Sequence, residues 1–226
     1  MPTGLITAER LRLFAPHCDY LAVAPALDAA AQAHGISTPR RIRHWLAQMS
    51  VESAGFTRLE EDLTYTTPER ICAVWPSRFP TIAAATPFLR NPRGLAERVY
   101  GGRGGNDVAG DGWRYRGRSW MDITFKRNYG RASAWCGLDL VAQPDQAADP
   151  KVASTIAAAF WEMEGLNEAA DADAGEKIYA TIEAGVRGNE LDDLKQETLT
   201  VNGGLTGWPD RQRQLLRAAT IWKDAA

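Results

Sequence analysis

The chain has 226 residues, enough for one domain or a two-lobed unit with a sizeable core. Its formal net charge of -2 gives no reason to expect nucleic acid as a partner. The three cysteines, Cys18, Cys72 and Cys136, are odd in number and contain no Cys-x-x-Cys pair, so we expect neither a disulfide framework nor a metal site.

The N-terminal segment lacks a basic start followed by an apolar core, and it lacks a small-residue cleavage site. No apolar stretch approaches the length of a membrane span. We therefore expect synthesis in the cytoplasm without a signal peptide and without stable insertion into a membrane.

Hydrophobic periodicity predicts helices along most of the chain. Residues 7–34 are predicted to form two helices, separated by Pro16 and by the region of Pro25. Residues 1–37 are expected to pack on residues 38–226 within one domain. Apolar contacts of the two helices are expected at Leu11, Phe14, Leu21, Val23 and Leu27.

Thr38 and Pro39 predict the start of the next helix, because a capping hydroxyl is followed by proline at the first helical position. Apolar residues three and four positions apart predict its buried face: Ile42, Trp45, Leu46 and Met49. Glu52 lies at the end of this repeat. Gly55 is expected to stop the helix in a left-handed conformation.

The middle of the chain is predicted to be broken into short elements. Thr67 and Pro68 predict a short helix that is closed by Pro76, and residues 80–100 predict one or two helices interrupted at Asn91-Pro92. The glycine-rich residues 101–112 predict a loop. Residues 112–125 have the strongest β signal.

The last third of the chain is predicted to be strongly helical. Asp149-Pro150 predicts a helix start and Gly165 its end, followed by helices through Ile178 and Val186 and from about Asn189. A final helix is expected after residues 200–211.

Glu52 and Glu61 are the candidate catalytic pair. One carboxyl group at the end of a buried helix and one in a polar loop across a groove match what glycoside hydrolysis requires, an acid with a raised pKa and an ionised base. Glu60, next to Glu61, is an alternative carboxylate, and most glutamates are solvated surface charges.

Residues 48–65 resemble the opening motif of glycoside hydrolase family 19, in the compact form found in phage and prophage endolysins. That motif has the form AQ-x-x-x-ES-x-GF followed by E-[ND]-L-x-Y, whose tyrosine corresponds to Tyr65, a substrate-binding candidate.

Residues 110–129 resemble the central signature of the family, GDG-x-x-Y-x-GR-G-x-x-Q-[IL]-[ST]-x-x-x-NY. The resemblance implies that Thr124 holds the attacking water and that Asn128 binds a sugar. It also places Tyr115 on an aromatic position lining the cleft.

Three residues depart from the family pattern. Ser119 replaces a glycine, Val51 replaces a common histidine, and Asp122 replaces a glutamine. An ionised aspartate only accepts hydrogen bonds, so substrate contacts at Asp122 must differ from those of an amide. A third carboxylate is also expected to raise the pKa values of its neighbours.

Residues 200–211 resemble the third signature, [IV]-NGG-x-x-G-x-x-DR. The resemblance implies that Asn202 donates its amide to the substrate and that Arg211 reaches the catalytic carboxylates. The arginine and lysine run between Arg114 and Arg131 suits either an anionic polymer or a solvated face.

The three signatures together imply a mainly helical, lysozyme-like bilobed fold with a small β element beside a deep cleft. They also imply an inverting glycosidase that needs no cofactor, with the two carboxyl groups roughly 6.5 to 9.5 Å apart. We expect a monomer that cleaves the β-1,4 bonds of peptidoglycan glycan strands, in the manner of a muramidase, as an endolysin after release, for example through a phage holin. The alternatives are a chitinase, a lytic transglycosylase and a non-catalytic wall-binding derivative.

Overall fold

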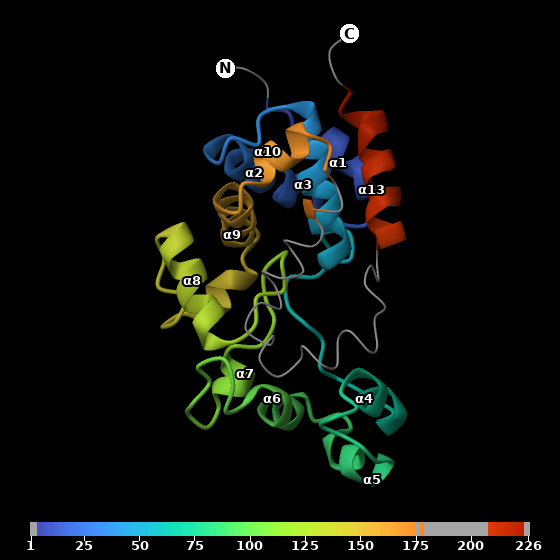
Figure 1. Cartoon of the computed structure of the whole chain (residues 1–226), viewed down its shortest axis with the longest axis vertical. Helices are drawn as coiled ribbons and strands as arrows, with labels where there is room; N and C mark the ends of the chain where they lie inside the picture. The colour runs from blue at the N-terminus through green and yellow to red at the C-terminus, as the bar shows by residue number, and fades with distance from the viewer. Residues whose placement is uncertain (1–3, 175–176, 179–207, 224–226) are drawn as a thin grey trace.

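The structure, a computed structural model, describes residues 4–174, 177–178 and 208–223 (Figure 1). These residues are mostly helical, which confirms the predicted class. Their buried apolar side chains form two separate clusters, a large one built mainly by the helices before residue 53 and after residue 125, and a small one built by residues 63–125. We call the two parts the large lobe and the small lobe.

Helix α3 (Pro39–Glu52) is the centre of the large lobe. Its start is as predicted, because the Thr38 side chain accepts a hydrogen bond from Arg41 N and Pro39 occupies the first turn. The predicted apolar stripe is fully buried, with Trp45, Leu46 and Met49 at 0% exposure. Helices α10 (Leu166–Asp171) and α13 (Trp208–Ile221) pack against α3.

Helices α1 (Ala8–Phe14) and α2 (Tyr20–Ala33) precede α3, and the predicted break at Pro25 is wrong. Pro25 lies inside α2 and removes the hydrogen bond that would reach the carbonyl of Leu21. Leu21 is 70% exposed, so water can hydrate that carbonyl. The same exposure shows that the predicted apolar contact of Leu21 is also wrong.

Helix α9 (Pro150–Met163) begins where Asp149 caps the amides of Lys151 and Val152, as predicted. It packs against α2 and against α8 (Lys126–Cys136), and the short helix η2 (Pro144–Ala148) lies beside its start. The sequence did not predict α8, because most of its residues are polar and its buried apolar stripe, Tyr129 and Ala132, is short.

The small lobe contains short helices α4 (Pro68–Val74), α5 (Ile82–Ala85), η1 (Thr86–Phe88), α6 (Pro92–Tyr100) and α7 (Asp111–Arg114). The predicted break before Pro92 is confirmed, and Asn91 caps α6 by accepting from Gly94 N at 3.0 Å. The side chains between these helices form the small cluster around Ile71, Phe79 and Leu95.

The β element is smaller than predicted. Residues 111–114 form helix α7, and the ladder among the described residues consists of two isolated antiparallel bridges, Glu60 with Arg118 and Arg118 with Ile123. The left-handed conformations of Ser119, Asp122 and Phe125 interrupt the extended backbone that a longer strand requires.

Some predictions concern residues outside the described ranges: most of the helix through Ile178 and Val186, the helix from about Asn189, and residues 200–207. Within the part of the chain that the structure does describe, no helix is both long enough and apolar enough to cross a membrane.

Candidate active site

Glu52 is the last residue of α3 and is held by the guanidinium of Arg211 from α13. Arg211 Nη2 donates to Glu52 Oε1, and Arg211 Nη1 donates to Gln48 Oε1 at 2.7 Å. Gln48 and Glu52 are four residues apart and share one helix face. The expected contact between Arg211 and a candidate catalytic carboxylate is therefore present at Glu52.

The chain reverses direction directly after Glu52. Ala54, Gly55 and Phe56 all have positive φ angles, of 52°, 74° and 60°. The helix thus ends through three consecutive left-handed residues rather than at Gly55 alone. Ser53 stabilises the turn, because its hydroxyl donates to Met49 O at 2.6 Å and accepts from Phe56 N at 2.9 Å.

Glu61 is held on the turned-back segment by donors to both of its carboxylate oxygens. Gly117 N donates to Oε1 at 2.6 Å, and the Tyr100 hydroxyl donates to Oε2 at 2.8 Å. Burial raises the pKa of Glu61, while Gly117, Tyr100, Arg116 and Arg58 oppose the rise. Glu61 lies in a loop, as predicted, and its carboxylate packs between Tyr100 and the backbone at Gly117.

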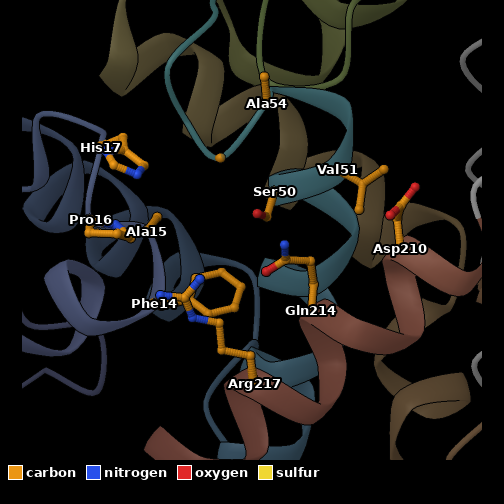
Figure 2. A pocket seen from close by; sticks show the side chains of 11 residues that line it. Phe14, Ala15, Pro16, His17, Ser50, Val51, Ala54, Asp210, Gln214 and Arg217 are labelled. Atoms are coloured by element: carbon orange, nitrogen blue, oxygen red, sulfur yellow. The ribbon is translucent and has the colours of Figure 1, made fainter.

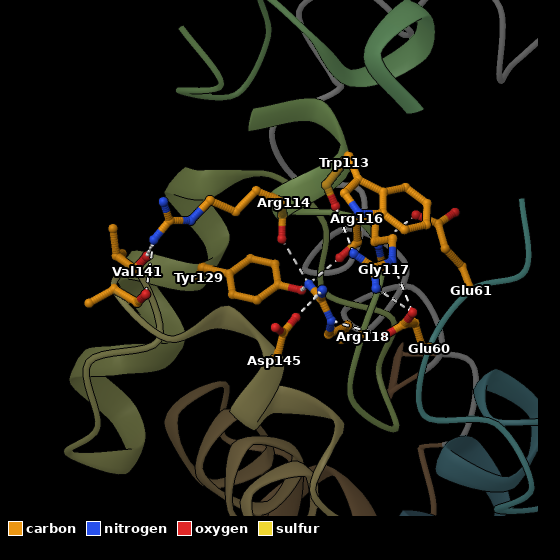
Figure 3. Close-up of polar contacts among 11 residues, drawn as sticks. Glu60, Glu61, Trp113, Arg114, Arg116, Gly117, Arg118, Tyr129, Val141 and Asp145 are labelled. Carbon is orange, nitrogen blue, oxygen red and sulfur yellow. Dashed lines mark hydrogen bonds and ion pairs between the residues drawn. The ribbon is translucent and has the colours of Figure 1, made fainter. Parts of the chain in front are cut away.

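Glu60 forms ion pairs within the protein, and its carboxylate points away from that of Glu61 (Figure 3). It accepts hydrogen bonds from Arg116 Nε at 3.0 Å and from Arg118 Nε at 3.1 Å, and it also pairs with Arg116 Nη2. Neighbouring residues on extended backbone point to opposite faces. The side chain of Glu60 therefore lies on the face opposite that of Glu61.

Arg118 locks the loop that holds Glu61. Its side chain is 1% exposed and donates to Arg114 O and the Tyr129 hydroxyl, both at 2.9 Å (Figure 3). It also pairs with Asp145 at 2.5 Å. Arg116 and Arg118 are buried and form ion pairs within the protein, so the run of basic residues from Arg114 to Arg131 is only partly exposed on the surface.

Asp122 lies close to Glu61 through Gly117. A Cβ atom added to Gly117 would be 2.3 Å from Asp122 Oδ1, so this carboxyl group rests directly on the glycine whose amide binds Glu61. Burial, followed by the charges of Glu61 and Glu52, raises the pKa of Asp122 to about 7, against the attraction of Arg58.

The three carboxyl groups of Glu52, Glu61 and Asp122 therefore form one electrostatic cluster. We call them the carboxyl cluster. The sequence predicted that Asp122 would raise the pKa values of its neighbours. In the structure the pKa of Asp122 itself is raised, first by burial and then by the charges of Glu61 and Glu52.

Thr124 and Asn128 are linked to Asp122 by a chain of hydrogen bonds. The Thr124 hydroxyl donates to Asp122 O at 3.1 Å, and Asn128 Nδ2 donates to Thr124 O at 2.8 Å. Asn128 is 6% exposed at the start of α8. In this structure its amide nitrogen positions Thr124.

Tyr115 and Tyr65 are the remaining candidates among the described residues, and the charge of Glu61 acts on Tyr65. Tyr115 is 2% exposed, its hydroxyl donates to Val141 O at 3.0 Å and its ring packs on Tyr129, so the expectation that it lines a cleft is wrong. Tyr65 is half-buried against Trp75 in the small lobe. Asn202 lies outside the described residues.

A separate cavity of about 350 Å³ lies between α1, the end of α3 and α13 (Figure 2). Its lining includes Phe14, His17, Val51, Asp210 and Gln214. Val51 thus faces this cavity, whereas Glu52 is held by Arg211. The departure at Val51 therefore leaves the observed contacts of Glu52 in place.

Sequence reasoning missed Tyr100, Gly117 and Arg58 as neighbours of the carboxyl cluster. Tyr100 ends a helix with an ordinary apolar stripe, and nothing in its local sequence marks the hydroxyl. No described group of three or more His, Cys, Asp or Glu residues has the geometry to hold a metal ion.

No profile of a known protein family matches the chain, whereas single relatives do. A Haemophilus influenzae protein described as a glycosyl hydrolase family 19 domain-containing protein is 30% identical over 221 residues, which is 97% of this chain and 98% of the relative. This chain belongs to glycoside hydrolase family 19. As a member of that family it is a glycosidase.

Solved structures confirm the bilobed, lysozyme-like family 19 fold. Chitinase C from Streptomyces griseus matches with a TM-score of 0.64 at 16% identity, over 100% of this chain and 96% of its own. A bacterial family 19 chitinase matches with a TM-score of 0.59 at 17% identity, over 98% of this chain and 96% of its own. At these identities the likeness establishes the fold alone.

Proposed function

We propose that this family 19 glycosidase cleaves β-1,4-linked N-acetylhexosamine polymers by an inverting mechanism in which Glu52 is the acid and Glu61 the base. The observation that carries the proposal is the carboxyl cluster, in which Glu61 and Glu52 both act on Asp122. Inversion requires the two carboxyl groups to be roughly 6.5 to 9.5 Å apart, so that a water molecule fits between them and the sugar.

Glu61 is suited to the role of base. Both of its oxygens accept hydrogen bonds, which favours the ionised form, while burial raises its pKa toward the working range of a general base. The Thr124 hydroxyl donates its hydrogen bond to Asp122 O, so its lone pairs can accept a hydrogen bond from the attacking water. Glu61 then removes the other proton of that water.

Glu52 in this scheme delivers a proton to the glycosidic oxygen. Arg211 contacts the Glu52 carboxyl group in the free enzyme, so the scheme requires the bound glycan to weaken this contact before the proton is transferred. Arg211 then stabilises the carboxylate that remains after proton transfer.

The test uses three matched glutamine variants. Glu52→Gln and Glu61→Gln are expected to lower kcat at least a thousandfold with unchanged folding, whereas Glu60→Gln should retain kcat within about fivefold and unfold at a lower temperature. Turnover on a soluble oligosaccharide and thermal unfolding are measured together. Near-normal turnover by Glu61→Gln would contradict the assignment of the base.

For the substrate we propose peptidoglycan, and for the biological role host lysis as an endolysin. Support comes from charge: residues 63–131 contain twelve Lys and Arg against five Asp and Glu, and the other residues contain fourteen against twenty-three. We call residues 63–131 the basic segment. Peptide stems give peptidoglycan carboxylates that the basic segment can attract, whereas chitin carries none.

Chitin is the second candidate substrate, because the solved structures with this fold include proteins named chitinases. Lysis of outer-membrane-permeabilised cells and cleavage of soluble chitin oligomers should be compared at equal enzyme concentration. Cleavage of chitin oligomers alone would favour the chitinase, and mass spectrometry of released wall fragments identifies the cleaved bond. Anhydro-muropeptide products would reveal a lytic transglycosylase. The absence of any product from either polymer would indicate a wall-binding protein.

A further inference from the structure

Asp122 stands apart from the other two members of the carboxyl cluster, because its side chain accepts a hydrogen bond from none of the residues that the structure describes. Glu61 receives hydrogen bonds from Gly117 and Tyr100, and Glu52 receives them from Arg211. No described residue donates a hydrogen bond to the Asp122 side chain, and the carboxyl group is wedged against the Cα of Gly117.

The charges around Asp122 are those of Glu61 on the turned-back segment, Glu52 at the end of α3, and Arg58 between them. Two of the three are negative. Arg58 also donates to the backbone oxygen of Glu52 at 3.3 Å. A half-buried carboxylate with two anionic neighbours and no donor among the described residues is destabilised, and binding a proton relieves both the burial of charge and the repulsion.

We propose that Asp122 works as a neutral carboxylic acid in the active enzyme. Its hydroxyl donates a hydrogen bond to the glycan, and its carbonyl oxygen accepts a hydrogen bond from the glycan. A protonated carboxyl group offers one donor and one acceptor, as the glutamine amide of the central signature does. Asp122 then preserves the hydrogen-bonding pattern that an ionised aspartate would lose.

The consequence is a loss of activity as the pH rises. Near and above pH 7 Asp122 ionises, consistent with its pKa of about 7, and the donor to the glycan disappears. The new negative charge also acts on Glu61 and Glu52. The ligand part of this proposal rests on the proposed function, whereas the protonation of Asp122 does not.

The first test follows the carboxyl carbon of Asp122 by NMR in ligand-free enzyme labelled with ¹³C-aspartate, with the Asp122→Asn spectrum used for assignment. We expect a titration midpoint near pH 7, compared with about 4 for an ordinary aspartate. A midpoint below about pH 4.5 overturns the proposal, and this readout requires no turnover.

The second test compares pH profiles of kcat/KM for the wild type, Asp122→Asn and Asp62→Asn. The last variant removes an exposed carboxylate next to Glu61 and serves as the control. Asp122→Asn should stay within about fivefold of wild type at pH 5.5 and extend activity by about one pH unit on the alkaline side, and Asp62→Asn should leave the profile unchanged.

A hundredfold loss for Asp122→Asn at every pH would show that the ionised carboxylate does the work and would overturn the proposal. Wild-type enzyme that cleaves no glycan refutes the proposed function alone, since the NMR titration still decides the protonation of Asp122.

Discussion

Ser119 shows how a single backbone angle shapes the loop beside the active site. Its φ angle is 76°, in the region that glycine adopts without strain, and the family signature places a glycine there. Its hydroxyl contributes a long hydrogen bond to Ala153 O at 3.4 Å. The strain outweighs so weak a bond.

Ser119→Gly is therefore expected to raise the free energy of unfolding by about 0.5 kcal/mol, after the greater chain entropy of glycine is subtracted. Gly110→Ala is the matched control, because Gly110 has a φ of 95° and open space around its Cα. That variant should lose about 1 kcal/mol in urea unfolding. If Ser119→Gly lowers the free energy of unfolding instead, the hydrogen bond to Ala153 O stabilises the protein by more than the backbone strain costs.

The contact between α3 and α13 determines how Glu52 is presented. Arg211 bridges Gln48 and Glu52 with two nitrogen atoms of one planar group, a geometry that lysine cannot reproduce. Arg211→Lys keeps the charge and loses one of the two contacts.

We expect Arg211→Lys to lower kcat more than tenfold and the free energy of unfolding by roughly 1 to 3 kcal/mol, because a buried Gln48 oxygen is left without its donor. Steady-state kinetics and chemical denaturation measure the two effects. Arg213→Lys, at an exposed position on the same helix, should change neither. A full-rate Arg211→Lys enzyme would show that the bridge is only structural.

Elements with strong local signals were predictable. Thr38-Pro39 and Asp149-Pro150 fix helix starts through capping groups and proline, and the α3 stripe fixes the buried face. Pro25 was misjudged because its effect depends on the exposure of Leu21, a tertiary property. Helix α8 was missed since its apolar stripe is short.

The candidate active site was predictable only as far as the motifs reach. They pointed to Glu52, Glu61 and Arg211 as candidates, while the contacts that set Glu60 apart from Glu61 depend on the positions of Arg116 and Arg118. The burial of Tyr115 and the crowding of Asp122 against Gly117 both arise from contacts across the fold. Residue type alone does not encode such contacts.

At the scale of the whole molecule, charge is divided unevenly along the chain. Exposed arginines of the basic segment include Arg70, Arg90, Arg93 and Arg98, and none of these four forms an ion pair with a described residue. An anionic polymer can therefore interact with these side chains, and such an interaction weakens as salt is added.

The double variant Arg90→Glu/Arg93→Glu should lower the rate on peptidoglycan several-fold at low salt, because electrostatic attraction becomes repulsion. Its rate on an uncharged chitin oligomer should be unchanged. Arg12→Glu/Arg213→Glu, which reverses two exposed charges of the large lobe, is the control. Equal losses on both substrates would remove the charge argument for peptidoglycan.

Glu52 and the arginine that binds it are separated by 159 positions in the chain. During translation the glutamate leaves the ribosome many seconds before its cation is made, at the usual speed of synthesis. An unfinished polypeptide therefore holds an incomplete carboxylate–guanidinium pair. Chains that end before position 211 are therefore expected to lack the contact that holds Glu52.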